Sequence, residues 1–158
     1  DRVCLFIKKL NKIQSQLKAP KNQRNNFGGY NYRSCEDIME AVKPLLEETG
    51  TVLTVSDDIV CVGNRVYVKA TATLMDETGD HIENSAFARE AETKKGMDDS
   101  QITGAASSYA RKYALNGLFC IDDTKDADTD EYKKQTSDDD FFAKPKETNP
   151  PKNGWRLT

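Results

Sequence analysis

Residues 65–74 alternate between apolar and polar side chains, and this pattern restricts the fold more than any other in the chain. One set of side chains is apolar and consists of Val66, Val68, Ala70, Ala72 and Leu74. The other set is polar or aromatic and consists of Tyr67, Lys69, Thr71 and Thr73. Because successive side chains of a strand point to opposite faces, the pattern predicts a strand with one buried face.

Turn-forming residues flank this strand on both sides. Gly63-Asn64 separates it from the apolar segment 59–62, which is typical of a two-residue hairpin, and residues 76–80 form the next turn. The chain returns as another strand over about 81–91, and residues 51–55 add a further extended segment. We therefore expect a small, mostly antiparallel sheet of three or four strands.

Two helices are expected at the two ends of the ordered part. Apolar residues spaced by three and four mark the first over roughly 2–18, before Pro20. Its apolar stripe consists of Val3, Phe6, Leu10, Ile13 and Leu17. The last helix is expected from about 99 to 118, entered through Asp98, Asp99 and Ser100.

A further helix is expected between the first helix and the sheet. Ser34 is a suitable N-cap, with Asp37 three residues later in a weak version of the capping box, and Gly50 marks the end. Its apolar stripe consists of Ile38, Val42, Leu45 and Leu46. Pro44 lies inside this helix and should kink or restart it. The expected fold class is therefore α+β, with about three helices packed against the sheet.

Composition divides the chain near residue 121. Residues 1–34 carry eight Lys or Arg and one acidic residue, although the formal net charge of the whole chain is -3. Residues 122–158 carry ten acidic and seven basic side chains and little apolar surface to offset the entropy of ordering. We expect a core over 1–121 and a disordered acidic tail over 122–158. The basic N-terminal segment either contacts a polyanion or is the solvated face of the first helix.

Several classes of protein are disfavoured by what the chain lacks. The cysteines (Cys4, Cys35, Cys61 and Cys120) are scattered without a CxxC pair, and His81 is the only histidine, so we expect reduced thiols and no metal site. No apolar run has membrane-spanning length and no signal peptide is visible, which favours a cytoplasmic protein. Neither a GxxxxGK[ST] loop nor a GxGxxG motif is present, so we expect no ATP-driven motor and no cofactor.

One catalytic interpretation is left open. Glu92-Thr93-Lys94 at a strand end, with Asp76 or Asp80 upstream, is similar to the acidic pair and lysine of Mg²⁺-dependent nucleases. There, two carboxylates hold the metal and the lysine orients the attacking water. Such triplets are common by chance, so a solvated strand end is the favoured interpretation and no catalytic residue is expected.

The segment before the second helix combines aromatic side chains with a cation. Tyr30, Tyr32 and Arg33 lie close together in a region rich in Asn, Gly and basic residues, which we expect to be an ordered loop or arm. Flat aromatic faces stack on bases, and nearby positive charge binds the phosphate backbone. Two interpretations remain: the tyrosines contact bases, or they fill the core beneath the second helix.

The last helix contains the most distinctive run, Gly104-Ala-Ala-Ser-Ser-Tyr-Ala-Arg-Lys-Tyr-Ala-Leu115. Its small residues permit close approach of another backbone, either a strand or a phosphodiester chain. Helical spacing places the expected core face on Ile102, Ala105, Ala106, Tyr109 and Tyr113. It places Ser107 and Arg111 nearly opposite, with Ser108 and Lys112 on the flank.

These two segments together resemble the signature regions of the essential recombination function family of phage annealing proteins. The resemblance covers roughly residues 8–123, including the acidic Asp122-Asp123 that follows the last helix. It implies a β-β-β-α core similar to the annealing-recombinase fold, assembled into homo-oligomeric rings or filaments. Lys112 stands where the family often has a second arginine, which keeps the charge but loses bidentate geometry.

The implied function is ATP-independent binding and annealing of single-stranded DNA in phage homologous recombination, without an enzymatic step. We expect the strand to lie in a groove between the sheet and the helices. The expected DNA-binding residues are Tyr30, Tyr32, Arg33, Lys94, Lys95, Ser107, Ser108, Arg111 and Lys112, with Lys94 and Lys95 at the rim. Alternatives are a module that protects single strands without annealing them and, less favoured, the Mg²⁺-dependent nuclease.

The tail contains one recognisable segment, the acidic run Asp138-Asp139-Asp140 followed by Phe141-Phe142. It resembles the acidic, Phe-ended tip with which bacterial single-strand binding proteins dock repair enzymes. The segment therefore either binds a host or phage repair protein or is a generic solvated tail.

Overall fold

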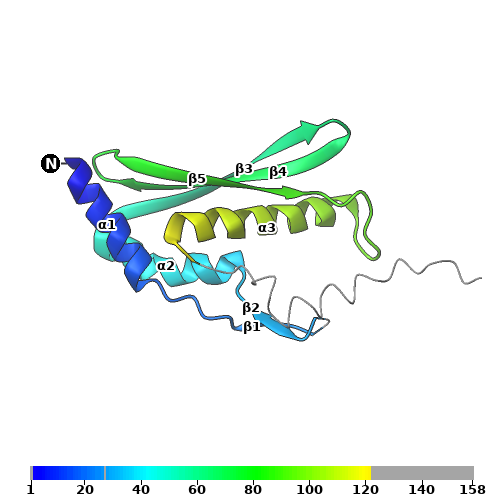
Figure 1. Ribbon diagram of the computed structural model, residues 1–158, viewed down its shortest axis with the longest axis horizontal. Helices are drawn as coiled ribbons and strands as arrows, with labels where there is room; N and C mark the ends of the chain where they lie inside the picture. Colours follow the sequence, from blue (N-terminus) through cyan, green and yellow to red (C-terminus); the bar gives the residue numbers. More distant parts are fainter. Residues whose placement is uncertain (1, 27, 122–158) are drawn as a thin grey trace, which may run out of the picture. The chain divides into compact units, whose positions relative to one another are not determined.

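The computed structural model describes residues 2–26 and 28–121, and the predicted tail lies outside them. The described part is α+β with three helices, as expected, and it has two antiparallel sheets rather than one (Figure 1). In chain order the elements are α1 (Arg2–Gln16), β1 (Gln23–Asn25), β2 (Tyr30–Tyr32), α2 (Cys35–Thr49), β3 (Thr51–Val62), β4 (Arg65–Asp76), β5 (His81–Arg89) and α3 (Asp99–Phe119). The order β3-β4-β5-α3 is the expected β-β-β-α unit. None of the helices in this part is long and apolar enough to cross a membrane.

The larger sheet is a meander in the order β3-β4-β5. Its first hairpin turns at Gly63-Asn64, where Gly63 has φ 61°, and Val62 pairs with Arg65. The extended segments 51–55 and 59–62 are one continuous strand rather than two. Along β4, Val68, Ala70, Ala72 and Leu74 are buried while the alternate residues are partly exposed, so the predicted faces are confirmed.

Helix α3 lies along the buried face of this sheet, and α2 packs against α3 on the side away from the sheet (Figure 1). Helix α1 contacts both α2 and α3. The core between these layers includes Phe6, Leu10, Ile13, Ile38, Val42, Leu74, Leu115 and Phe119. No described helix covers the other face of the sheet. The sheet therefore has one buried and one solvated face, which is common in antiparallel sheets.

Two capping boxes fix where α2 and α3 begin. The Ser34 hydroxyl accepts from the Asp37 backbone N–H at 3.1 Å, and the Asp37 carboxylate accepts from the Ser34 N–H at 2.9 Å. Asp98 and Gln101 form the same reciprocal pair at α3. Helix α2 ends at Gly50 in the left-handed conformation, as predicted. It continues through Pro44 as one helix, so the restart expected there does not occur.

The predicted core face of α3 is wrong in one respect, because Tyr109 and Tyr113 are exposed by 59% and 44%. Ile102 and Ala106 are buried as predicted, but the buried face continues through Ala110 and Ala114 rather than the tyrosines. Since α3 lies between the sheet and α2, small side chains are needed where the backbones approach closely. The amide of Asn84 on β5 donates to the Ala114 carbonyl at 2.9 Å, and a Cβ added at Gly117 would lie 2.3 Å from the same amide nitrogen.

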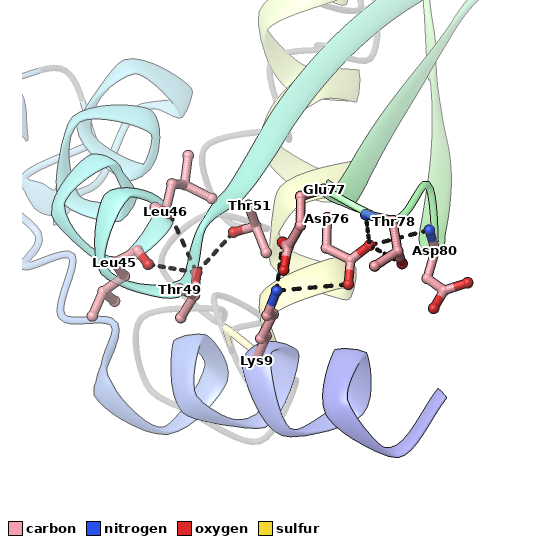
Figure 2. Close-up of polar contacts among 9 residues, drawn as sticks. All are labelled: Lys9, Leu45, Leu46, Thr49, Thr51, Asp76, Glu77, Thr78 and Asp80. Atoms are coloured by element: carbon pink, nitrogen blue, oxygen red, sulfur yellow. Dashed lines mark hydrogen bonds and ion pairs between the residues drawn. The ribbon is translucent and has the colours of Figure 1, made fainter. Parts of the chain in front are cut away.

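A polar junction joins α1, the end of α2 and the β4–β5 turn (Figure 2). The Lys9 Nζ of α1 lies 2.6 Å from Glu77 and 3.7 Å from Asp76. One Asp76 oxygen accepts from the hydroxyl and backbone N–H of Thr78 and from the Asp80 N–H. Beside it, the Thr49 and Thr51 hydroxyls are 2.8 Å apart. Part of the basic N-terminal segment therefore stabilises the fold.

The expected arm before α2 contains a short antiparallel ribbon, β1-β2, which the sequence pattern did not reveal. Its register pairs Gln23 with Tyr32 and Asn25 with Tyr30. The side chain of Arg24 donates to Asn31 across the ribbon at 3.2 Å. Gly29, with φ 66°, lies in the turn. The ribbon therefore places Tyr32 just before the start of α2.

Candidate nucleic-acid interface

The centre of the candidate site is a carboxylate held between α3 and β3. Asp57 on β3 accepts from the Ser107 hydroxyl at 2.5 Å and from Arg111 Nε at 3.0 Å and Nη2 at 3.1 Å. Asp57 pairs across the sheet with the buried Ala70, so its side chain lies on the face that α3 covers. Two predicted DNA-binding residues, Ser107 and Arg111, are thus already engaged by an anion of the same chain.

This triad of Asp57, Ser107 and Arg111 is only partly shielded from water. The Arg111 and Asp57 side chains are 35% and 24% exposed. Partial burial raises the pKa of Asp57, but the hydrogen bonds from Arg111 and Ser107 outweigh it, and its pKa lies below the ordinary value. The bond to Asp57 raises the pKa of Arg111. Asp57 and Arg111 are therefore both ionised near neutral pH, and Asp57 offsets part of the positive charge that Arg111 could present to a ligand.

The neighbouring residue of α3 connects this triad to the ribbon. Lys112 Nζ lies 5.8 Å from the centre of the Tyr32 ring, within the range of a cation–π contact. Tyr32 and Lys112 are both half-buried. The structure therefore brings together residues from two distant segments of the chain.

The start of α2 lies close to the same place. Cys35 and Glu36 both interact electrostatically with Arg111. Burial, followed by the contact with Glu36, raises the pKa of Cys35 to about 11, so its thiol is protonated at neutral pH. Arg33 is half-buried beside them and is engaged in a contact of its own. The backbone of Tyr30 lies in β2, and its side chain is outside the described atoms.

Tyr109 and Tyr113 form an exposed aromatic pair on α3 that sequence reasoning assigned to the core. Their ring centroids are 5.9 Å apart with an interplanar angle of 39°. Tyr109 and Lys112 are three residues apart and are therefore neighbours on the helix surface. Two exposed tyrosines beside a cation are an unexpected addition to the predicted site. Their high exposure is the feature that the helical spacing alone did not disclose.

The remaining predicted residues divide into two groups. Ser108 is exposed on α3 next to the triad. Lys94 and Lys95 are exposed in the loop before α3, and the structure does not bring them to the triad. Arg111 lies 13 residues after the N-cap Asp98, which is roughly 20 Å along the helix at 1.5 Å per residue. Lys94 and Lys95 therefore mark a separate place near the start of α3.

The carboxylates of the nuclease interpretation do not meet. Asp76 and Asp80 precede β5, whereas Glu92 follows its other end. The nine residues of β5 span roughly 30 Å at about 3.4 Å per residue, so these carboxylates cannot share one metal ion. Within residues 2–26 and 28–121, no group of three or more His, Cys, Asp or Glu side chains could hold a metal ion.

Comparison with known proteins agrees with the resemblance described above. The ERF superfamily model matches residues 6–154. A protein of Salmonella phage P22, the "Essential recombination function protein", is 63% identical over 130 residues, which cover 82% of this chain. The matched region spans 62% of the length of that relative. The chain belongs to the ERF superfamily.

Proposed function

We propose that the chain binds single-stranded DNA and anneals complementary strands in phage homologous recombination, without ATP or a cofactor. Membership of the ERF superfamily and the name of the phage P22 relative support a role in recombination. The observation that carries the proposal is the contact of Lys112 with Tyr32, which brings two distant segments of the chain together next to Arg111 and the exposed pair Tyr109 and Tyr113.

In the proposed binding mode, cations and aromatic rings contact different parts of the strand. Lys112 and the outer edge of Arg111 contact phosphates, while the exposed tyrosines offer flat faces to the bases. Arg111 directs Nε and Nη2 at Asp57, and no described residue accepts a hydrogen bond from its Nη1. A phosphate oxygen can bind there without breaking the triad. Since the contacts are mainly to phosphates, the strand is held irrespective of its sequence.

Annealing then follows from presentation of the strand. A strand whose backbone is bound and whose bases are accessible is extended and ready to pair, and base pairing itself supplies the driving force. No bond is made or broken, so the proposal includes no enzymatic step. Val3 and Ile7, one turn apart on α1, are exposed by 64% and 51%, which is apolar surface suited to contacts between copies. A homo-oligomer, ring or filament, would hold a longer stretch of strand.

The test combines binding and annealing in one mixture. Two complementary strands, each with one dye of a fluorescent pair, are mixed with the protein in Mg²⁺ without ATP, and duplex and strand length are followed. We expect faster duplex formation than without protein, and intact strands. Tight binding with no acceleration would favour a protective module instead. Duplex that forms only with ATP, or strands that are cut in Mg²⁺, would refute the proposal.

The proposed partners beyond DNA concern parts of the chain outside the described residues. The acidic segment Asp138–Asp140 with Phe141 and Phe142 is proposed to bind a repair protein of the host or phage, with a solvated tail as the alternative. A pull-down from host lysate with the parent and with Phe141→Ala/Phe142→Ala decides between them, since identical captured proteins would exclude docking by these rings.

A further inference from the structure

The face of the sheet that α3 does not cover carries an ordered set of cations and aromatic rings near the β3–β4 hairpin. Arg65, Tyr67 and Lys69 alternate along β4 with the buried residues and so share this outer face. The register places Arg89 opposite Tyr67 and Phe87 opposite Lys69. We call these five residues the outer patch: Arg65, Tyr67, Lys69, Phe87 and Arg89.

The two strands place unlike side chains next to each other in this patch. Lys69 Nζ lies 5.8 Å from the centre of the Phe87 ring. Phe87 is 55% exposed, although a phenylalanine on a solvated face contributes little to folding. Tyr67 is half-buried beside it. The patch therefore offers accessible ring surface with a cation adjacent to each ring.

The positive charge of the patch is only partly offset by its surroundings. In the part of the chain that the structure describes, neither Arg65 nor Arg89 forms an ion pair. On the outer face the nearest carboxylate is Asp58 on β3, opposite Lys69, and Glu83 lies farther along β5. At the hairpin end, Arg65 and Arg89 also line a pocket with Glu90, Glu92 and Asp99 from the loop after β5 and the start of α3. The outer face itself therefore carries three cations near one carboxylate, whereas the adjoining end of the sheet is mixed in charge.

The composition of the outer face changes along the strands. Beyond the patch, the Thr71 and Ser85 hydroxyls bond to each other at 2.8 Å, and the next pair is Thr73 with Glu83. The far end presents Val52 and Met75, with exposures of 58% and 38%. On this face the Lys, Arg, Tyr and Phe side chains of β4 and β5 are therefore confined to the hairpin end.

This combination matches the chemistry of single-stranded nucleic acid better than that of a protein partner. Exposed aromatic rings on an antiparallel sheet stack on unpaired bases, and nearby Lys and Arg bind the phosphates between them. The centre of a protein interface is enriched in arginine and aromatic residues but depleted in lysine, whereas here Lys69 lies against the exposed Phe87 ring. A polyanion with flat bases satisfies both kinds of side chain at once.

We propose that the outer patch is a second binding surface for single-stranded nucleic acid, separate from the Arg111–Lys112 site. Asp57 and its partner Ala70 lie on the inner face of the sheet, whereas Tyr67 and Lys69 lie on the outer face, so the sheet separates the two surfaces. One copy of the chain then has room for two strands. This inference goes beyond the proposed function and does not depend on whether the chain anneals DNA.

Photo-crosslinking of the intact chain locates the bound bases directly. An oligonucleotide that contains 5-iododeoxyuridine is irradiated with the full protein, and the modified residues are identified by mass spectrometry. We expect crosslinks at Tyr67 or Phe87 in addition to those at the α3 site. Crosslinks confined to Tyr32, Tyr109 and Tyr113 would overturn the proposal.

Binding measurements on matched variants provide the second readout. In an Arg111→Ala/Lys112→Ala background, Phe87→Ala should weaken binding of a labelled oligo-dT about five- to 150-fold, as expected for loss of one stacked base. Val52→Ala is the control, because it lies on the same face with similar exposure. A plot of log affinity against log salt concentration has a slope that reports the number of phosphate contacts. Lys69→Gln should make this slope shallower by about 0.7, whereas Lys8→Gln on α1 should not change it.

Two further outcomes refute the proposal. If Phe87→Ala and Lys69→Gln bind like Val52→Ala and Lys8→Gln, the patch has no role in binding. If Phe87→Ala instead lowers the mass measured by light scattering and leaves DNA affinity unchanged, the patch is a contact between copies. The two proposals can fail separately. If the outer patch crosslinks to DNA but the protein does not accelerate annealing, the outer patch is supported and the proposed annealing function is refuted.

Discussion

Replacement of Asp57 by asparagine tests whether the triad restrains Arg111. The variant keeps the shape of the side chain but removes the charge that binds Arg111 at 3.0 and 3.1 Å. A charge-assisted hydrogen bond contributes about 1.5–3 kcal/mol when shielded, but exposed ion pairs contribute less. With the two side chains 35% and 24% exposed, we expect a loss of about 1 kcal/mol in the free energy of unfolding. For a core of this size that is a fall in Tm of roughly 4 °C.

The same change should strengthen DNA binding. Asp57 is a fixed anion beside the cation that we assign to a phosphate, so it competes with the ligand and repels it. Without that charge, Arg111 is free for one full phosphate contact. We expect Asp57→Asn to bind single strands several-fold more tightly at low salt, with a log–log salt slope steeper by about 0.7.

Fluorescence anisotropy with labelled oligo-dT over a salt series measures affinity and slope together, and thermal melting measures stability. Glu48→Gln is the matched control, because it also removes one carboxylate from an ion pair, with Lys12, in a different place. Weaker binding by Asp57→Asn, or an unchanged slope, would refute this reasoning. Asp57 would then position Arg111 rather than compete for it.

Other predictions concern the exposed rings, the packing of α3 and the pH dependence of stability. Tyr109→Ala and Tyr113→Ala should each weaken single-strand binding about five- to 150-fold with little change in Tm, since the rings are 59% and 44% exposed; a large fall in Tm with unchanged affinity would return them to the core. Gly117→Ala should destabilise the core by about 1–3 kcal/mol in denaturant unfolding, because its Cβ would lie 2.3 Å from the Asn84 amide; a stability equal to the parent would contradict this close approach. The folded-state pKa values of Asp37, Asp57 and Asp76 all lie below the ordinary 3.8, so the stability that they contribute is present above that pH and lost as the pH falls through the folded values. Urea unfolding between pH 6 and pH 2 should show this loss, less steeply in Asp57→Asn, and a stability that does not decline would exclude it.

Local patterns predicted the sheet and the helix ends well. The alternation along β4, the Gly63-Asn64 turn and the capping residue Ser34 act within a few residues, so the sequence discloses them directly. The buried and exposed faces of α3 were harder to predict, because the sheet covers this helix on one side and α2 covers it on another. Its buried residues are therefore no single stripe, and the small Ala110 rather than the large Tyr109 is buried.

The sequence predicted the cations of the candidate site but not the carboxylate that binds Arg111. Arg111 and Lys112 were identified from sequence, and Lys112 does meet Tyr32. Asp57 was not identified, because its side chain reaches α3 only through the strand register that pairs it with Ala70. Such a contact across 54 positions leaves no local pattern. Lys94 and Lys95 were grouped with Arg111 by charge alone, and the length of α3 separates them.

The most direct test of the central claim is the annealing rate with the proposed cations present and absent. Complementary dye-labelled strands are mixed with the parent, with Arg111→Ala/Lys112→Ala, and with the exposed-charge control Lys43→Gln on α2, all without ATP. We predict that the parent and Lys43→Gln accelerate duplex formation equally, and that the double variant, although folded, gives nearly the protein-free rate. A folded double variant that anneals as fast as the parent would contradict the account.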